Sequence, residues 1–96
     1  ARVLGQYSAL AVLNLGCNRI GDEGARSLAQ VLDQCFSLTV LDLRVNYIGD
    51  AGAARLAGVL GQCSALAELH LEGNGIGYHS IAMIGFSIQG TTQLFT

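Results

Sequence analysis

The chain contains no proline, no tryptophan and no lysine, so its five basic residues are all arginine. Charged residues make up 12% of the chain and the formal net charge is −2. Proteins that bind nucleic acids concentrate positive charge on one surface, so we expect no nucleic-acid partner. No apolar run reaches the roughly 18 residues of a membrane-spanning helix, and no signal segment opens the chain. With 51% hydrophobic residues in 96, the sequence instead fits one small folded domain.

Cysteine is scarce as well, with Cys17, Cys35 and Cys63 as the three thiols. An odd number cannot all pair, and no C-x-x-C motif or histidine-rich cluster accompanies them. We interpret them as buried reduced thiols, which is typical of a cytoplasmic protein. The alternatives are a disulfide or a metal site. We expect no cofactor.

One pattern of leucine and asparagine occurs three times. Leu10-x-x-Leu13-x-Leu15-x-x-Asn18-x-Ile20-Gly21 recurs at residues 38–49 and 66–77, with a spacing of 28 residues. Gln6, Gln34 and Gln62 align before each unit. The sequence therefore predicts a single domain with repeats at 6–33, 34–61 and 62–89, after a helix end at 1–5 and before a tail at 90–96.

Each unit changes its hydrophobic period halfway. Leu13 and Leu15 alternate as in a strand with one buried face, whereas Ala25, Leu28 and Leu32 follow helical spacing. Asp22 is the predicted N-cap of this helix. One strand and one helix bury too little surface to fold alone, so the units must stack. The prediction is an α/β solenoid in which Leu13, Leu41 and Leu69 form one buried column.

The motif L-x-x-L-x-L-x-x-N-x-[IL]-G with this period resembles the ribonuclease-inhibitor type of leucine-rich repeat, which also occurs in NACHT-type receptors, Ran GTPase-activating proteins and tropomodulins. The resemblance implies a curved right-handed superhelix, with parallel strands on the concave face and helices on the convex face. It implies that three asparagines bond to the backbone of adjacent turns, and that Cys35 and Cys63 point inward. This asparagine ladder consists of Asn18, Asn46 and Asn74.

Both ends depart from the pattern. Residues 1–5 align with the end of a helix, so we expect a fragment of a longer array. After Glu72 the chain has no Asp, Glu, Lys or Arg. Residues 78–96 are a divergent unit, a misread gene end or an apolar contact surface; we favour a divergent unit with a helix capped by Ser80. Leu94, 28 residues after Leu66, opens a further strand.

The strand residues that alternate with the leucines are the candidate binding residues. They predict a specificity patch for a protein partner, made of Asp42, Arg44, Glu68, His70 and Glu72. We expect Arg44 to pair with Glu72 across the strands. Asp42 and His70 occupy equivalent positions in adjacent strands, as an exposed charged pair rather than half of a catalytic triad.

The glycines of Gly73–Gly77 superficially suit a dinucleotide-binding turn, but residue 78 is tyrosine, so we interpret them as the ordinary repeat turn. We therefore predict no catalytic, metal or cofactor site. The expected function is protein binding by a segment of a larger cytoplasmic protein. The alternatives are a GTPase-activating type of regulator and a structural spacer. We also expect the isolated chain to self-associate through its apolar ends.

Overall fold

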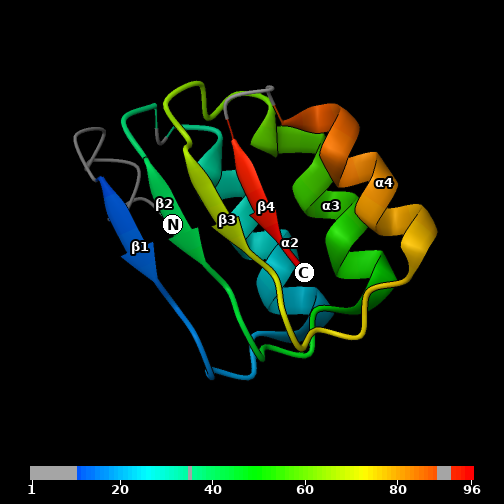
Figure 1. Ribbon diagram of the computed structural model, residues 1–96. Coiled ribbons are helices and arrows are strands. Elements are labelled where there is room, and N and C mark those ends of the chain that lie inside the picture. Colours follow the sequence, from blue (N-terminus) through cyan, green and yellow to red (C-terminus); the bar gives the residue numbers. More distant parts are fainter. Residues whose placement is uncertain (1–10, 35, 89–91) are drawn as a thin grey trace.

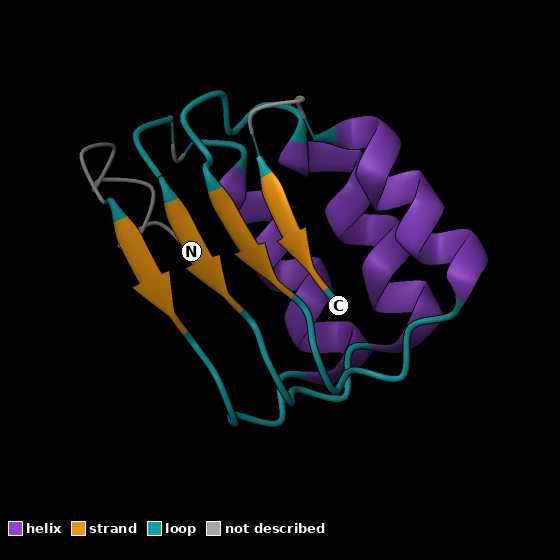
Figure 2. Ribbon diagram, in the orientation of Figure 1, coloured by secondary structure: helices purple, strands orange, loops and turns teal. Residues whose placement is uncertain are grey.

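The computed structural model describes residues 11–34, 36–88 and 92–96, in which strands and helices alternate along the chain. The strands are β1 (Val12–Asn14), β2 (Val40–Asp42), β3 (Glu68–His70) and β4 (Gln93–Phe95). The helices are α2 (Gly21–Leu32), α3 (Gly49–Leu60) and α4 (Tyr78–Ser87). The strands form one layer and the helices lie side by side in a second layer behind it (Figures 1 and 2).

The sheet is parallel, and its order β1-β2-β3-β4 follows the chain. Leu13, Leu41, Leu69 and Leu94 pair in one lateral row. The side chains of Leu41 and Leu69 are fully buried, while Leu13 and Leu94, at the two ends, are partly buried. The predicted leucine column and the predicted fold class, an α/β leucine-rich-repeat solenoid, are confirmed.

The last step of the sheet is shorter than the repeat period. A strand at Leu94 is present as predicted, but its predicted register is wrong, because Leu94 pairs with Leu69 and not with Leu66. Part of the difference lies in the preceding helix. Helix α4 has 10 residues, whereas α2 and α3 have 12 each. A strand therefore lies within the segment that the sequence suggested was a tail.

Small residues set the distance between neighbouring helices. Gly52 on α3 faces Ala25 on α2, and a Cβ at Gly52 would lie 3.1 Å from the Ala25 Cβ and 2.6 Å from Ile48 Cγ2. The helices approach closely enough for leucines beneath them to fill the space to the sheet. Each fully buried leucine contributes about 1.5–3 kcal/mol relative to leaving it in water.

The helices do not begin as the sequence suggested. Asp22 lies inside the first turn of α2, the N-cap is Ile20, and no side chain caps this helix. The Gly21 N–H instead donates to the Asn46 carbonyl at 2.7 Å, and the Gly49 N–H to the Asn74 carbonyl at 2.9 Å. A backbone carbonyl of the following repeat thus satisfies one of the first N–H groups of the helix, which have no partner within the helix itself.

Helix α4 begins differently. Ser80 lies within the helix and is not its cap; the N-cap is Gly77, whose N–H donates to Asp50 Oδ1 at 2.8 Å. This bond, followed by one from the Ser80 side chain, holds the pKa of Asp50 below its ordinary value. The acidic residue in the first turn of α3 therefore anchors the start of the next helix rather than its own.

The cysteines differ in environment. Cys63 is buried, with Sγ 3.6 Å from the Leu32 carbonyl oxygen. Cys17 is exposed, so the prediction of a buried thiol is wrong there. It occupies the turn after β1, at the position of the half-exposed Val45 in the next repeat. Cys35 lies outside the described residues.

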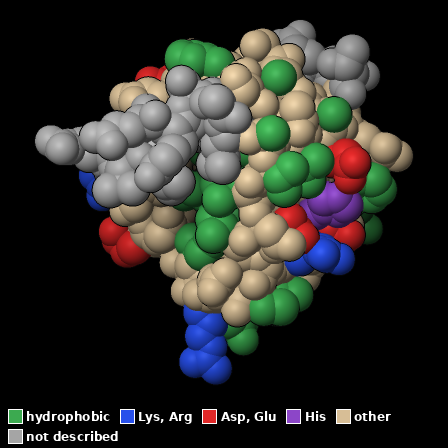
Figure 3. Space-filling model, turned by 90° about the vertical axis from the view of Figure 1, so that its left-hand side faces the viewer, with side chains coloured by type: hydrophobic (Ala, Val, Ile, Leu, Met, Phe, Trp, Pro, Cys, Tyr) green, Lys and Arg blue, Asp and Glu red, His purple; other side chains and the backbone are tan. Residues whose placement is uncertain are grey.

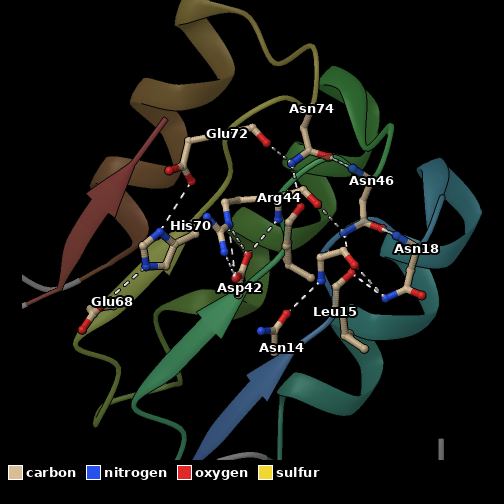
Figure 4. A network of polar contacts seen from close by, with 12 residues as sticks. Asn14, Leu15, Asn18, Asp42, Arg44, Asn46, Glu68, His70, Glu72 and Asn74 are labelled. Carbon is tan, nitrogen blue, oxygen red and sulfur yellow. Dashed lines mark hydrogen bonds and ion pairs between the residues drawn. The ribbon is translucent and has the colours of Figure 1, made fainter.

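Asparagine side chains join the turns of successive repeats (Figure 4). Asn46 is fully buried; its Oδ1 accepts from the Asn18 N–H at 2.8 Å and the Ile20 N–H at 3.3 Å. Its Nδ2 donates to the Leu15 carbonyl at 2.8 Å and the Arg44 carbonyl at 3.2 Å. Asn74 makes the same set one repeat later. An amide, which both donates and accepts, is suited to join two backbone segments.

We predict that Asn46→Ala lowers the free energy of unfolding by about 1–3 kcal/mol, because four backbone groups lose a hydrogen bond to a fully buried side chain. Urea unfolding followed by circular dichroism measures this change. Asn18→Ala is the matched control. Asn18 is exposed, and among the described residues its side chain donates to the Leu15 and Gly16 carbonyls of its own repeat and to no other group. A loss as large for Asn18→Ala as for Asn46→Ala would contradict the role assigned to the buried amide.

The turns after β1, β2 and β3 each contain two residues with left-handed backbone before the helix begins. The φ values are 61° and 53° at Cys17 and Arg19, and 53° and 58° at Val45 and Tyr47. The third repeat has Gly73 and Gly75 at these positions, with φ of 73° and 66°. Only glycine adopts this conformation freely, and a β-branched residue is strained there. Val45 is therefore a strained residue whose side chain is about half exposed.

Val45→Gly is expected to raise the free energy of unfolding by about 0.5–1 kcal/mol, since relief of the left-handed strain exceeds the added entropy of the unfolded chain. Val12→Gly is the opposite case, because Val12 is an exposed valine in a regular strand. That substitution should cost about 0.5–1 kcal/mol. Thermal melts of both variants decide the matter, and a lower melting temperature for Val45→Gly would contradict the prediction.

Candidate protein-interaction face

The candidate site is the concave face, which we define as the surface of the sheet turned away from the helices. Its side chains alternate with the buried leucines, as in β3, where Glu68 and His70 are partly exposed on either side of the buried Leu69. In Figure 3 acidic, basic and histidine side chains gather at one edge of the molecule's surface, beside hydrophobic side chains. The alternation arises from the strand period of two.

Asp42, the last residue of β2, forms an ion pair with Arg44, two residues further along the chain. Arg44 Nη2 lies 2.7 Å from Asp42 Oδ2, and Arg44 Nε lies 3.0 Å from Asp42 Oδ1. The Arg44 backbone N–H also donates to Asp42 Oδ1 at 3.1 Å. The Arg44 side-chain hydrogen bond is the main cause of the lowered pKa of Asp42, and the same bond raises the pKa of Arg44. Asp42, expected at the surface, is buried, while half of the Arg44 side chain remains exposed.

The expected cross-strand pair of Arg44 with Glu72 is wrong. Arg44 is bound by Asp42, and Glu72 contributes only a weaker, more distant charge that raises the Arg44 pKa. The Asp42 carboxylate accepts hydrogen bonds from two nitrogens of the Arg44 guanidinium and from the Arg44 backbone N–H. Because Asp42 is only two residues before Arg44, these bonds form within one stretch of chain, and Arg44 pairs with Asp42 rather than with Glu72. In the first repeat the Gly16 N–H bonds to Asn14 Oδ1 at 3.1 Å in the same local manner.

His70 lies between two carboxylates of its own chain segment (Figure 4). Its Nε2 is 3.1 Å from Glu68 Oε1, and its Nδ1 is 3.5 Å from Glu72 Oε1. Asp42 and His70 are in register as expected. Asp42 nevertheless pairs with Arg44, and His70 contacts Glu68 and Glu72. The ion pair expected between Asp42 and His70 across the two strands is therefore wrong.

Phe95 completes this cluster and was not foreseen from the sequence. Its ring stacks on the His70 imidazole, with centroids 4.3 Å apart and an interplanar angle of 4°. The stack exists because Phe95 on β4 pairs in register with His70 on β3. The 28-residue period placed Leu94 three positions away from its true register. Alignment of Thr92-Gln93-Leu94-Phe95 with Ala67-Glu68-Leu69-His70 would have found it.

Two atoms of the cluster have no hydrogen-bond partner. His70 Nδ1 and Glu72 Oε1 are buried, and each lacks a partner among the residues that the structure describes. They are the same two atoms that face each other at 3.5 Å, which is too far for a good hydrogen bond. The cluster is thus polar and contains one close contact that is not a hydrogen bond.

Residues 11–34, 36–88 and 92–96 contain no group of three or more His, Cys, Asp or Glu residues that could hold a metal ion. In the same ranges no helix has both the length and the apolar character needed to cross a membrane. Gly73 and Gly75 lie in the turn that every repeat forms, at positions where the earlier repeats also have positive φ.

Asp42→Asn is expected to lower the free energy of unfolding by about 1 kcal/mol near neutral pH, because the charge-assisted bonds to Arg44 weaken. Since the folded pKa of Asp42 is lowered, its stabilisation is complete above the unfolded pKa of about 4 and is lost as the pH falls through the folded value. Urea unfolding from about pH 6 to pH 3 should show a smaller loss of stability in the variant than in the wild type. Parallel curves would contradict the prediction.

The first two repeats resemble a known family of repeats. A sequence model of the leucine-rich repeat family matches residues 10–29 and 34–57, within the first two repeats. A search of curated proteins finds no match. Leucine-rich repeats generally mediate protein–protein interaction, and domains built from them are typically non-enzymatic. The two matched repeats, on a sheet and helix layer that recur with the same period, support a leucine-rich repeat family for this chain.

Proposed function

We propose that this chain is a protein-interaction module that binds a protein partner through its concave face. One observation carries the proposal: the three described helices all lie on one side of the sheet, and the other side presents charged side chains in lateral rows (Figures 2 and 4). The rows Val12–Val40–Glu68 and Asn14–Asp42–His70 follow directly from the strand register. The side chains on this surface can be substituted without disturbing the buried leucines, and this freedom suits a surface that recognises a particular partner.

Within the predicted patch the residues have different roles. Arg44, Glu68 and Glu72 keep roughly half of their side chains exposed and are the contact residues of the proposal. Asp42 and His70 are largely buried and position them. Four strands of three residues each make a small face compared with the roughly 800 Å² per partner of a standard interface. We therefore propose that the module acts as a segment of a larger cytoplasmic protein of the ribonuclease-inhibitor type, and that its partner is a protein rather than a nucleic acid.

We propose further that the isolated chain self-associates weakly through its ends. A hollow of about 310 Å³ opens beside β1 and α2, lined mainly by apolar side chains that include Leu15, Ile20 and Leu28. The corresponding residues of the second repeat, Leu43, Ile48 and Leu56, are buried in the core. Apolar surface left uncovered in this way favours association.

The test compares two charge-matched triple variants of the protein as it exists in the cell. The concave variant is Arg44→Ala, Glu68→Ala and Glu72→Ala. The convex control is Glu23→Ala, Arg26→Ala and Asp33→Ala, which also removes one basic and two acidic exposed side chains. We expect the concave variant to lose captured partners about tenfold or more in quantitative cross-linking, because it removes the central contacts of an interface.

The convex control should retain those partners at the wild-type level. The convex control should melt close to the wild type, since surface changes usually alter stability by less than about 0.5 kcal/mol. The concave variant also removes the Arg44 bonds to the buried Asp42, so we expect it to lose about 1 kcal/mol, as for Asp42→Asn, and circular dichroism must show that it is folded. Undiminished capture by the folded concave variant would refute the proposed function.

A further inference from the structure

The contact between His70 Nδ1 and Glu72 Oε1 is not a hydrogen bond, and a neutral imidazole can donate to only one of the two glutamates beside it. A neutral imidazole has one N–H and one lone pair. If Nε2–H donates to Glu68 Oε1 at 3.1 Å, the lone pair of Nδ1 faces Glu72 Oε1 at 3.5 Å. The other tautomer moves the same conflict to Glu68. Buried acceptors without donors are unfavourable, so this arrangement gains free energy from any donor that reaches both atoms.

The charge around this contact is negative. Asp42 and Arg44 neutralise each other, which leaves Glu68 and Glu72 as the charges without a cationic residue in contact when His70 is neutral. Their side chains are 47% and 40% exposed, so both are within reach of a bound molecule. Charge complementarity therefore favours a cation, and the missing donor favours one that carries N–H groups.

The aromatic stack restricts how such a group can approach. Phe95 stacks on one face of the His70 ring. Glu68 and Glu72 lie at the two nitrogen edges of that ring (Figure 4). The approach is therefore along the ring edge at Nδ1, once the half-exposed Glu72 side chain turns outward. Beside the cluster, Val40 and the exposed Val12 continue the lateral row of Glu68 as an apolar strip.

We propose that the His70, Glu68 and Glu72 cluster binds a lysine or arginine side chain of the protein segment that occupies the concave face, with an apolar residue of that segment on the valine strip. The cation donates to Glu72 Oε1 and His70 Nδ1 while His70 donates to Glu68. A guanidinium suits this site well because its planar fork presents parallel N–H groups. This inference rests on the proposed function and specifies the chemistry of its partner.

The test uses three pentapeptides with blocked termini, each with valines around a central arginine, glutamine or glutamate. Binding to the full chain is followed by NMR through the His70 ring protons and the backbone amides of β3. We expect the arginine peptide to bind about fivefold or more tightly than the glutamine peptide, and the glutamate peptide to bind weakest. The shifts should centre on residues 68–72.

Glu72→Gln should bring the arginine peptide to within about twofold of the glutamine peptide, while Glu23→Gln on the convex side, which makes the same change of charge, should have no effect. Unchanged amide shifts outside β3 verify that the Glu72→Gln chain is folded. Equal binding of the arginine and glutamine peptides would overturn the inference, because the cluster would then not distinguish a cation from a neutral amide. Preference for the glutamate peptide, or no binding, would also overturn it.

Failure of this inference is distinguishable from failure of the proposed function. If the concave triple variant loses its partners while the peptides show no preference for arginine, the face binds protein through other chemistry. If that variant keeps all its partners, the proposed function itself fails.

Discussion

The structure depends on one interaction: a buried asparagine amide that completes the backbone hydrogen bonds of the turn before it. Asn46 reaches back to the first repeat and Asn74 to the second, at the same distances. A repeat is therefore not a closed unit, because its turn lacks partners until the next repeat supplies them. The helix starts share this dependence, since Gly21 and Gly49 donate to carbonyls one repeat later. Stacking is required by hydrogen bonding as well as by the leucine core.

The same register determines what the concave face can present. It places chemically unrelated side chains in lateral rows, yet the polar contacts form along each strand segment, between Asp42 and Arg44 and between Glu68 and His70. Residues two apart share a face, and the backbone N–H of Arg44 holds Asp42 against its neighbour. The exposed charges are thus anchored by local partners. A pre-positioned side chain loses less entropy when it binds, which favours recognition.

The divergent third repeat differs from the first two in both its backbone and its part of the candidate site. Its helix is shorter, its turn has glycine at both left-handed positions, and its last strand arrives after fewer residues. The shortened step brings Phe95 beside His70 and so fixes the ring between two carboxylates. Loss of strict periodicity at this end therefore builds the most distinctive cluster of the concave face.

The sequence by itself determined the repeat period, the leucine column, the strand and helix of each unit and the rows of the open sheet face, because all of these depend on spacing along the chain. Only the tertiary structure decided that Asp22 and Ser80 cap no helix, that Asp42 is buried, that Arg44 does not bond to Glu72, and that Phe95 stacks on His70. Each of these depends on which of several nearby groups a polar or aromatic side chain meets in space. Periodicity specifies the direction in which a side chain points, but the choice among neighbouring partners follows from distances that exist only once the repeats are stacked.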